Sequence, residues 1–442
     1  MKKIFKDKKV VVMGLGLNGG GVGVAKFFCR QGASVLVADL QTKEQLQKSI
    51  DELKNFKVEF ALGGHRDEDF IDVDLIIKNP AVPHDSRYLK IAKEHKVLVK
   101  SDIEIFFELC KAPIIGITGT KGKTTTATLI YLFLKTKYPK TILAGNMGIS
   151  PLGILSKINK GSKVVLELSS FELEDLQKSP DIAVITSFFP DHLNRYKTFD
   201  DYVEAKKIIF KHQVKDNYLI LNLDDPKVAE LAQEATARVR FFSKNKPFAP
   251  IIPKEGLKIF GDQNISNISA AIEVAKIFRI SQKNIRKILL NFKGVKNRQE
   301  FVAEKRGVKY FNDTAATNPD SAIFGIKTFK QRFPAANLIL IAGGVDKNLN
   351  YTDLASEIKN NVGCLVLLPG NVSDILKKEI SFLLYRNLKV IPVNSMQEAV
   401  SVAAKEAEQG DIVLLSPASA SFNLFKNEFD RGDRFVEAVN KL

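Results

Sequence analysis

Residues 9–100 alternate short apolar runs with stretches of helical spacing. Residues 10–13 form an apolar run of strand length, and residues 34–39 form a second one. Between them, residues 24–28 carry apolar side chains at helical spacing. A strand, a helix and a second strand in this order form a parallel βαβ unit. We therefore predict a parallel sheet covered by helices in this part of the chain.

The same alternation continues to the C-terminus, in two further segments. The second segment begins with an apolar run just before Gly116, and the third begins after Arg298. Strands that alternate with helices predict an α/β fold in both. The strand candidates of these segments are residues 163–166, 182–186, 218–221, 337–341, 364–368 and 411–415, and the clearest helix is residues 264–278.

The length and composition indicate a globular protein with several domains. A chain of 442 residues exceeds one ordinary core, and 45% hydrophobic with 26% charged residues is close to average. No apolar run approaches the roughly 20 residues that span a bilayer, so membrane insertion is not expected. The basic and then apolar start resembles a signal peptide, but Asp7 and the glycine-rich loop favour a first β-strand.

Charge and cysteine content narrow the function further. The formal net charge is +16, yet the lysines are scattered and no block of five or more Lys or Arg occurs. We therefore favour a lysine-rich surface with sites for anionic ligands over nucleic-acid binding. The three cysteines, Cys29, Cys110 and Cys364, have no paired spacing. This predicts a reducing cytoplasm, with neither a disulfide framework nor a zinc site.

A first glycine-rich loop follows the first predicted strand. Residues 14–19 (GLGLNG) fit the G-x-G-x-x-G pattern, and Asp39 ends the next predicted strand. In a dinucleotide site the glycines admit the pyrophosphate and the acid holds a ribose hydroxyl, which makes an NAD-dependent oxidoreductase one hypothesis. A UDP-sugar offers the same chemical groups. A glycine turn without a ligand is the remaining alternative.

A second glycine-rich loop, residues 116–126 (GITGTKGKTTT), lies between a predicted strand and a predicted helix. Backbone N–H groups at such a loop point at a phosphate, and Lys123 adds a positive charge. Thr124 is placed to bind the Mg²⁺ that accompanies a nucleotide. Ile117 stands where the strict pattern has its first glycine, but Gly119 and Gly122 remain. An ATP site is therefore favoured over a turn without a ligand.

Three motifs, in this order along the chain, resemble those of the Mur ligase family. They are residues 118–125 (TGTKGKTT), 167–173 (ELSSFEL) and 191–196 (DHLNRY). The resemblance spans nearly the whole chain. It implies a Rossmann-like UDP-substrate-binding domain at 1–101, a P-loop-type ATP-binding domain at 102–298 and a Rossmann-like amino-acid-binding domain at 299–442.

The resemblance also implies an activity and its ligands. These are ATP-dependent ligation of D-glutamate to UDP-N-acetylmuramoyl-L-alanine, with Mg²⁺, in a cytoplasmic monomer that contributes to peptidoglycan synthesis. Ligases that add another amino acid, folylpolyglutamate-type ligases and mechanical P-loop ATPases remain alternatives. The Asp-Asn-Pro-Arg motif of the diaminopimelate-adding ligase does not occur.

The implied catalytic residues are Lys123, Glu167, His192 and a carbamylated lysine. Glu167, His192, Thr124 and the carbamate would hold Mg²⁺, although a lone histidine is more often structural. Lys206 and Lys207 are the candidates for carbamylation. At about 100° per residue, Lys206 falls within an apolar stripe, and the family pattern Tyr-x-x-Ala-Lys also selects it. The alternative is an unmodified Lys206 whose amine reaches solvent. The stripe consists of Tyr202, Ala205, Ile209 and Phe210.

The remaining implied contacts are those to the two nucleotides. Asn264 and Asn267 match asparagines at the adenine but could equally be helix caps. Asn79 and Asn146 could be turn formers alone. The predicted ATP contacts are Gly119, Thr120, Lys121, Gly122, Lys123, Thr124, Thr125, Asn264, Asn267, Arg298 and Asp313. The predicted contacts to the UDP substrate are Gly16, Leu17, Asn18, Gly19, Asp39, Asn79 and Asn146.

The predicted D-glutamate contacts are Thr317, Lys347, Ser421 and Phe422. Two departures from the family pattern bear on them. Ala315 replaces a lysine in the run at residues 312–318 (NDTAATN), and residues 428–429 (EF) reverse the expected order of acid and phenylalanine. These departures affect the details of amino-acid binding, not the reaction class.

Overall fold

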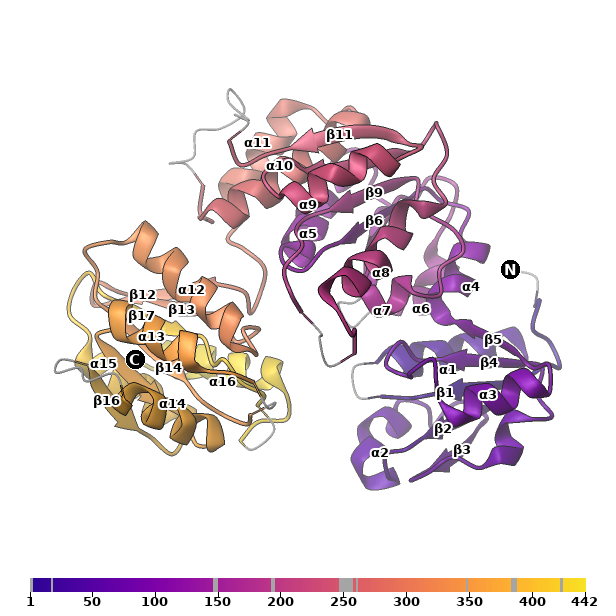
Figure 1. Cartoon of the computed structure of the whole chain (residues 1–442), viewed down its shortest axis with the longest axis horizontal. Coiled ribbons are helices and arrows are strands. Elements are labelled where there is room, and N and C mark those ends of the chain that lie inside the picture. Colours follow the sequence, from indigo (N-terminus) through magenta and orange to yellow (C-terminus); the bar gives the residue numbers. More distant parts are fainter. Residues whose placement is uncertain are drawn as a thin grey trace. The chain divides into compact units, whose positions relative to one another are not determined.

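A computed structural model gives the fold of the chain (Figure 1). It describes residues 3–16, 19–145, 150–191, 195–245, 257–259, 261–346, 349–382, 388–421 and 424–442. Six of the predicted site residues lie outside these ranges, namely Leu17, Asn18, Asn146, His192, Lys347 and Phe422. The chain forms two compact units, Met1–Ile251 with Ile265–Ile288, and Ile252–Asn264 with Leu289–Leu442.

The N-terminal sheet has five parallel strands in the order β3-β2-β1-β4-β5. Helix α1 contributes to an apolar core on one face, and α3 contributes to a smaller core on the other. The strands are β1 (Lys9–Met13), β2 (Ser34–Asp39), β3 (Val58–Leu62), β4 (Leu75–Lys78) and β5 (Leu98–Ser101), and the helices are α1 (Gly20–Gln31), α2 (Lys43–Asp51) and α3 (Arg87–Glu94).

The central sheet belongs to the same unit and has six parallel strands in the order β11-β10-β9-β6-β8-β7. Its strands are β6 (Ile114–Thr118), β7 (Ile142–Gly145), β8 (Val164–Glu167), β9 (Ile182–Ile185), β10 (Tyr218–Asn222) and β11 (Arg238–Phe242). The helices are α4 (Asp102–Leu109), α5 (Lys123–Lys135), α6 (Pro151–Ile154), α7 (Ser170–Leu173), α8 (Phe199–Lys211), α9 (Pro226–Ala229), α10 (Asp262–Ile277) and α11 (Gln282–Asn291).

The third sheet has six strands in the order β12-β13-β17-β14-β15-β16, and only its edge pair β12–β13 is antiparallel. Helices α12–α14 cover one face, and α15 and α16 cover the other. The strands are β12 (Glu300–Lys305), β13 (Val308–Asn312), β14 (Leu338–Ala342), β15 (Cys364–Leu367), β16 (Lys389–Pro392) and β17 (Ile412–Leu415). The helices are α12 (Pro319–Arg332), α13 (Thr352–Asn361), α14 (Asn371–Phe382), α15 (Met396–Glu406) and α16 (Glu428–Asn440).

The predicted α/β class and the predicted strands are confirmed, with ends that shift by a residue or two. The central strands read as continuous apolar runs because helices bury both faces of a parallel sheet. Strand β14, for example, is fully buried. The prediction did not include strands β3, β4, β5, β7, β11, β12, β13 and β16. Strand β12, for example, has alternating, partly exposed residues and lacks such a run. The domain boundaries themselves stay predictions.

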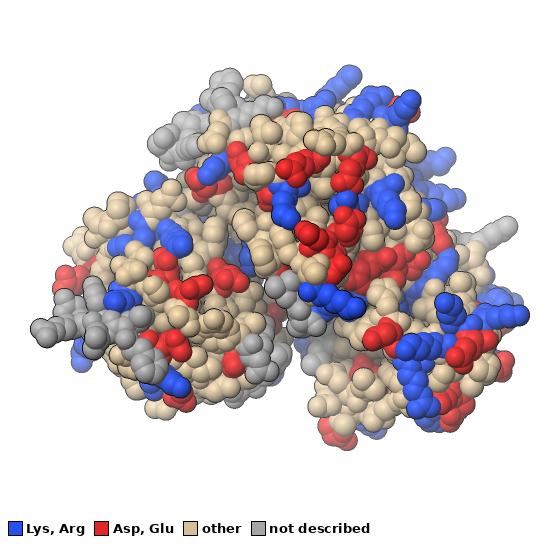
Figure 2. Space-filling view, viewed as in Figure 1, with Lys and Arg blue, Asp and Glu red and all other residues tan. Residues whose placement is uncertain are grey.

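Two surface features complete the description. On the face shown in Figure 2, Lys and Arg side chains are interspersed with Asp and Glu, as their scatter in the sequence predicts. Within the ranges that the structure describes, no helix is both long and apolar enough to cross a bilayer.

Candidate active site

The second glycine-rich loop joins strand β6 to helix α5 and has the geometry of a phosphate loop. Gly122 adopts a left-handed conformation directly before α5 (φ 87°). Gly119 has φ 138°, and a Cβ there would lie 2.0 Å from Oγ1 of Thr186. Both positions therefore require glycine. The N-terminus of a helix with 13 residues then faces the loop, where it favours an anion.

Residues at the end of β9 brace this loop. Oγ1 of Thr186 donates a hydrogen bond to the carbonyl of Lys121 (2.6 Å), and the N–H of Lys121 donates to Oγ of Ser187 (3.2 Å). The amine of Lys123 folds back onto the loop, where Nζ donates to the carbonyls of Gly119 (3.0 Å) and Thr120 (3.1 Å). The lysine charge is thus held at the loop where a phosphate would bind.

Glu167 ends strand β8, which pairs with β6 beside the phosphate loop. Its side chain is 2% exposed. Within the described part of the chain, Oε2 of Glu167 has no hydrogen-bond partner. A buried carboxylate oxygen without a partner fits a cation ligand, because leaving it unpaired is costly. The described residues contain no group of three His, Cys, Asp or Glu placed to hold a metal, and His192 lies outside them.

Lys206 lies on helix α8, within the apolar stripe that the sequence predicts. Its side chain is 2% exposed, with Nζ 3.4 Å from Oγ1 of Thr118 and 4.7 Å from the ring centre of Tyr202. Burial lowers the pKa of the Lys206 amine well below its usual value, and the charge of Lys123 lowers it further. The neutral form is therefore more accessible to this amine than to an exposed lysine.

Lys207 has the opposite environment. Its amine forms ion pairs with Glu204 (2.8 Å) and Glu234 (2.6 Å). Burial lowers the pKa of Lys207, but the hydrogen bonds to these carboxylates outweigh burial and raise the pKa overall. The structure thus reveals two ion-pair partners of Lys207, and both hold its amine in the ammonium form.

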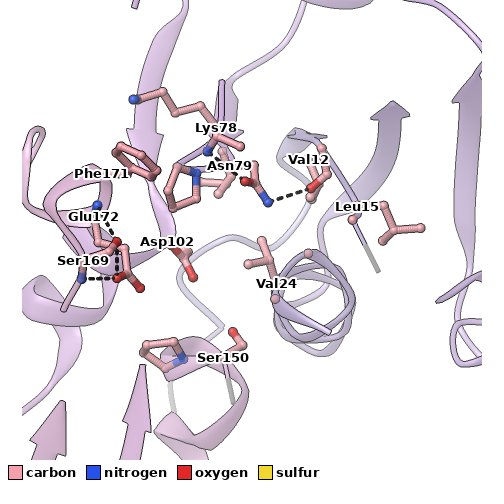
Figure 3. Close-up of a pocket in the computed structure, with 18 of the residues that line it drawn as sticks. Val12, Leu15, Val24, Lys78, Asn79, Asp102, Ser150, Ser169, Phe171 and Glu172 are labelled. Carbon is pink, nitrogen blue, oxygen red and sulfur yellow. Dashed lines mark hydrogen bonds between the residues drawn. The ribbon is translucent and has the colours of Figure 1, made fainter. Parts of the chain in front are cut away.

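The first glycine-rich loop lines a cavity of about 480 Å³ between the N-terminal and central sheets (Figure 3). The predicted contacts Gly16 and Asn79 both line it. Asn79 is held in place because its Nδ2 donates to the carbonyl of Gly14 (3.4 Å). Residues of the central domain complete the wall, including Ser150, Ser169 and Phe171.

Asp39 is buried below this loop and supports it. Its carboxylate accepts hydrogen bonds from the N–H groups of Leu15 (2.7 Å), Gly16 (3.2 Å) and Gln41 (2.9 Å). The side chain is 7% exposed. The acid that the glycine pattern assigns to a ribose hydroxyl is therefore engaged by backbone groups of the loop itself.

Two carboxyl groups on the cavity wall were missed by the sequence analysis. Burial raises the pKa of Asp102 to about 6 and that of Glu172 to about 7. Oε2 of Glu172 accepts hydrogen bonds from the backbone N–H and the hydroxyl of Ser169, both at 2.7 Å. The serine and the glutamate form a capping box at helix α7, a signal that the sequence contains but that does not reveal the burial.

Asn264 and Asn267 lie inside helix α10, so neither occupies its N-cap position. Asn267 is 2% exposed, and its Oδ1 accepts a hydrogen bond from Oγ1 of Thr126 on α5 (3.4 Å). This contact joins α10 to the helix that follows the phosphate loop. The structure thus brings Asn267 close to the predicted ATP site.

In the C-terminal unit, Arg298 lies exposed in a tight turn. The residues on either side, Asn297 and Gln299, both have left-handed backbones (φ 67° and 47°). Asp313 stabilises this turn, since its Oδ1 accepts a hydrogen bond from the N–H of Gln299 (3.1 Å). The structure therefore joins two predicted ATP contacts, Arg298 and Asp313, through one turn.

Thr317 and Ser421 lie on loops that a buried arginine connects. Arg431 is fully buried, and its guanidinium donates to Oγ1 and the carbonyl of Thr314 and to the carbonyl of Ser419 (3.0–3.1 Å). The sequence pattern does not single out Arg431, although the residue falls on the apolar face of α16 with Phe435. Among the described residues, Oγ of Ser421 is buried without a hydrogen-bond partner.

Comparison with known proteins agrees with this architecture. The chain matches the Mur ligase MurD-like N-terminal domain over residues 8–101, the Mur ligase middle domain over 117–255 and the Mur ligase glutamate ligase domain over 297–419. The UDP-N-acetylmuramoylalanine--D-glutamate ligase of Roseiflexus sp. (strain RS-1) is 40% identical over 98% of this chain and 99% of its own. The enzyme of the same name from Borreliella afzelii (strain PKo) is 38% identical over 99% of both chains.

Solved structures share the fold at low sequence identity. UDP-N-acetylmuramate-alanine ligase MurC from Thermotoga maritima has a TM-score of 0.63 and 19% identity, and the alignment covers 98% of this chain and 99% of that one. MurF ligase from the same organism, in complex with ADP, has a TM-score of 0.59 and 18% identity, with 100% and 96% covered.

The fold and the phosphate loop define a nucleotide-binding α/β protein with three domains. The sequence relatives narrow this class, because they match the chain from end to end. The chain belongs to the Mur ligase family.

Proposed function

We propose that this protein is a UDP-N-acetylmuramoyl-L-alanine:D-glutamate ligase that consumes ATP. The observation that carries the proposal is the end-to-end similarity to ligases of that name, at 35–40% identity. The solved neighbours do not choose between substrates, since MurC, MurF and E. coli FolC all share the fold. The MurD-like N-terminal match supports the D-glutamate branch.

The reaction must turn a carboxylate, which is a poor electrophile, into an acyl phosphate. We propose that ATP binds with its phosphates at residues 119–125 and transfers one to the alanyl carboxylate. Lys123 would exchange its two carbonyl partners for phosphoryl oxygens and stabilise their charge. The amine of D-glutamate then attacks the carbonyl carbon, and phosphate leaves.

The same site contains side chains that fit Mg²⁺. Glu167 offers the unpartnered buried oxygen, and Thr124 offers a hydroxyl at the start of α5. His192 and a carbamate on Lys206 complete the proposed ligand set. Bound Mg²⁺ would offset the negative charge on the phosphoryl oxygens.

Lys206 fits the role of the carbamylated residue because only a neutral amine reacts with CO₂. Its burial favours the neutral form, and the product is an anion that no longer repels Lys123. The ion pairs of Lys207 favour the unreactive ammonium form. We therefore propose Lys206, and not Lys207, as the modified residue.

The amino acid would be held by the C-terminal domain. Ser421 offers a buried hydroxyl without a partner among the described residues, and Thr317 offers a second hydroxyl. Lys347 and Phe422 are the other proposed contacts. Since Ala315 supplies no cation, Lys347 remains to pair with a glutamate carboxylate. We expect a higher KM for D-glutamate than in an enzyme with a lysine at position 315, because the charge-assisted hydrogen bond lost with that lysine contributes about 1.5–3 kcal/mol.

Compartment and assembly remain predictions. The three cysteines are all free thiols, which suits the reducing cytoplasm proposed for this reaction. We propose a monomer, since the three domains together contain all the contacts assigned above.

A coupled assay of ADP release tests the proposal. The purified protein is supplied with ATP, Mg²⁺ and UDP-N-acetylmuramoyl-L-alanine, and amino acids are added one at a time. We expect ADP release that depends on D-glutamate. Release with another amino acid and none with D-glutamate would assign a different ligase, and release without any amino acid would indicate a mechanical ATPase.

A further inference from the structure

The N-terminal and central sheets are joined by two separate sets of contacts around the cavity of Figure 3. The first set is apolar and involves helices α1, α4 and α6, which share one continuous core. Gly23 on α1 lies so close to α6 that a Cβ there would be 2.4 Å from Cβ of Ser150.

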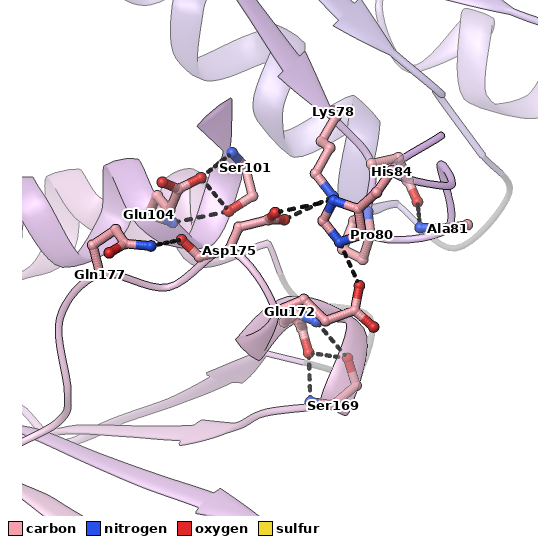
Figure 4. A network of polar contacts seen from close by, with 12 residues as sticks. Lys78, Pro80, Ala81, His84, Ser101, Glu104, Ser169, Glu172, Asp175 and Gln177 are labelled. Atoms are coloured by element: carbon pink, nitrogen blue, oxygen red, sulfur yellow. Dashed lines mark hydrogen bonds and ion pairs between the residues drawn. The ribbon is translucent and has the colours of Figure 1, made fainter. Parts of the chain in front are cut away.

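The second set is polar and lies at the far side of the cavity, where Figure 3 shows Lys78 and Phe171 well away from Ser150. Lys78 ends strand β4 of the N-terminal sheet, and Nζ is 2.7 Å from Oδ2 of Asp175 of the central domain. The two side chains are 4% and 16% exposed. Figure 4 shows this ion pair with His84 beside it.

Glu174 is the centre of the polar set. Its Oε2 lies 2.8 Å from Nε2 of His84 and accepts a hydrogen bond from Nη2 of Arg195 (2.7 Å). Its Oε1 accepts a hydrogen bond from the hydroxyl of Tyr196. Burial raises the pKa of Glu174, but these hydrogen bonds outweigh burial and lower the pKa to about 2. The carboxylate is therefore charged at any working pH.

Arg195 connects this carboxylate to the wall of the cavity. Its Nη1 donates to the carbonyl of Pro80 (3.1 Å), in the Asn79–Ala81 stretch that lines the cavity. Its guanidinium also lies 4.4 Å from the ring centre of Phe171, another wall residue. The polar set therefore holds wall residues from both domains at once.

We propose that Lys78, His84, Glu174, Asp175, Arg195 and Tyr196 form an interdomain latch that positions the cavity wall for the UDP-linked substrate. Glu174, Asp175 and Arg195 are positioning residues in this proposal, because they act through Lys78 and the Asn79–Ala81 loop. The proposal rests on the proposed function only for the identity of that substrate. None of the six latch residues belongs to the phosphate loop at residues 116–126, so we expect changes at Glu174 and Asp175 to leave ATP binding unaffected.

The variants Asp175→Asn and Glu174→Gln test the latch, since neither residue lines the substrate cavity. Removing one partner leaves the other buried charge uncompensated. We expect the KM for UDP-N-acetylmuramoyl-L-alanine to rise about tenfold or more in each variant, with the KM for ATP unchanged. The matched control is Glu52→Gln, which breaks the ion pair with Lys26 (3.0 Å) inside the N-terminal domain. It should leave both KM values unchanged.

A double variant separates positioning from a general loss of stability. If the pair acts by joining the domains, Lys78→Met with Asp175→Leu should bind the substrate better than Asp175→Asn alone, because an apolar pair leaves no buried charge. A double variant that is as impaired as the sum of the single variants would overturn the latch. So would an equal rise of both KM values in the single variants.

A binding measurement distinguishes failure of the latch from failure of the proposed function. Titration of the wild type and the variants with UDP needs no turnover, and small-angle scattering reports the separation of the domains. We expect weaker UDP binding and a larger radius of gyration in Asp175→Asn. If the wild type shows no turnover with D-glutamate but these differences persist, the proposed function fails and the latch stands. Unchanged UDP affinity and radius would overturn the latch.

Discussion

Lys206 and Lys207 are neighbours in the sequence and have opposite environments in the fold. The amine of Lys206 is buried beside Thr118 and Tyr202, whereas that of Lys207 pairs with two carboxylates. The helical period alone selects Lys206 as the buried residue. The helical period does not predict both ion-pair partners of Lys207, because Glu234 is distant from it in the sequence. The contrast between these lysines leads to a matched pair of variants.

We expect Lys206→Ala to lose activity by about 10³-fold or more, as for other groups that stabilise charge in a transition state. A small carboxylate such as formate should restore part of the activity by filling the space. Lys207→Ala should keep most of its activity, since its exposed ion pairs contribute about 1 kcal/mol or less. ADP release and the carbamate mass are the measurements. An inactive Lys207 variant beside an active Lys206 variant would contradict the assignment.

We expect substrate binding to depend on pH through Glu172, which lines the cavity. Because burial raises its pKa to about 7, the carboxyl is neutral below that pH and anionic above it. The ionised carboxylate of Glu172 would repel an anionic UDP substrate. The affinity for that substrate should therefore fall several-fold as pH rises through about 7. Glu172→Gln keeps the acceptor for Ser169 and should flatten this dependence. Titration calorimetry on both sides of neutral pH is the measurement.

The same raised pKa fixes the sign of a stability effect. Between the usual carboxyl pKa of 4.5 and about 7, the folded state binds more protons than the unfolded state. The free energy of unfolding should therefore fall as pH rises through this window, and less so in Glu172→Gln. A variant with the same pH slope as the wild type would contradict the burial argument.

At the scale of elements, the phosphate loop depends on the join between β6, α5 and the end of β9. The strand–glycine–helix order is visible in the sequence, whereas the bracing by Thr186 and Ser187 is not, because it connects residues far apart along the chain. The pattern of apolar and polar residues predicts local structure only. The sheet order, which places β9 beside β6, is decided by tertiary packing. Because Thr186 lies against Gly119, this position cannot accept a side chain.

Gly119→Ala should abolish ATP binding, because the new Cβ meets Thr186 at 2.0 Å and the left-handed backbone (φ 138°) disfavours any side chain. The loop must shift, and its N–H groups then no longer converge on a phosphate. The control is Gly161→Ala, since Gly161 is exposed and its nearest atom, in Asn159, would be 3.5 Å away. Nucleotide titration is the measurement, and tight ATP binding by Gly119→Ala would refute the loop assignment.

At the scale of the whole molecule, two of the three domains contain a glycine-rich loop of the kind that binds nucleotides, and we expect each to bind a different nucleotide. The N-terminal loop fits the dinucleotide pattern, but the carboxylate of Asp39 already accepts hydrogen bonds from the backbone N–H groups of Leu15 and Gly16. We predict that this domain binds UDP and not NAD. Calorimetry with each nucleotide is the measurement, and tight NAD binding without UDP binding would contradict the prediction.

The sequence by itself determined the α/β class, the two glycine-rich loops, the buried stripe of α8 and the family. These features are local or periodic, so short stretches of chain contain them in full. Tertiary structure alone decided that Asp39 supports a loop, that Arg431 joins the loops of Thr314 and Ser419, and that Lys78 pairs with Asp175. Each of these contacts joins residues brought together by packing. A charged side chain is buried only where a partner neutralises it or forms hydrogen bonds with it. The fold decides which residue becomes that partner.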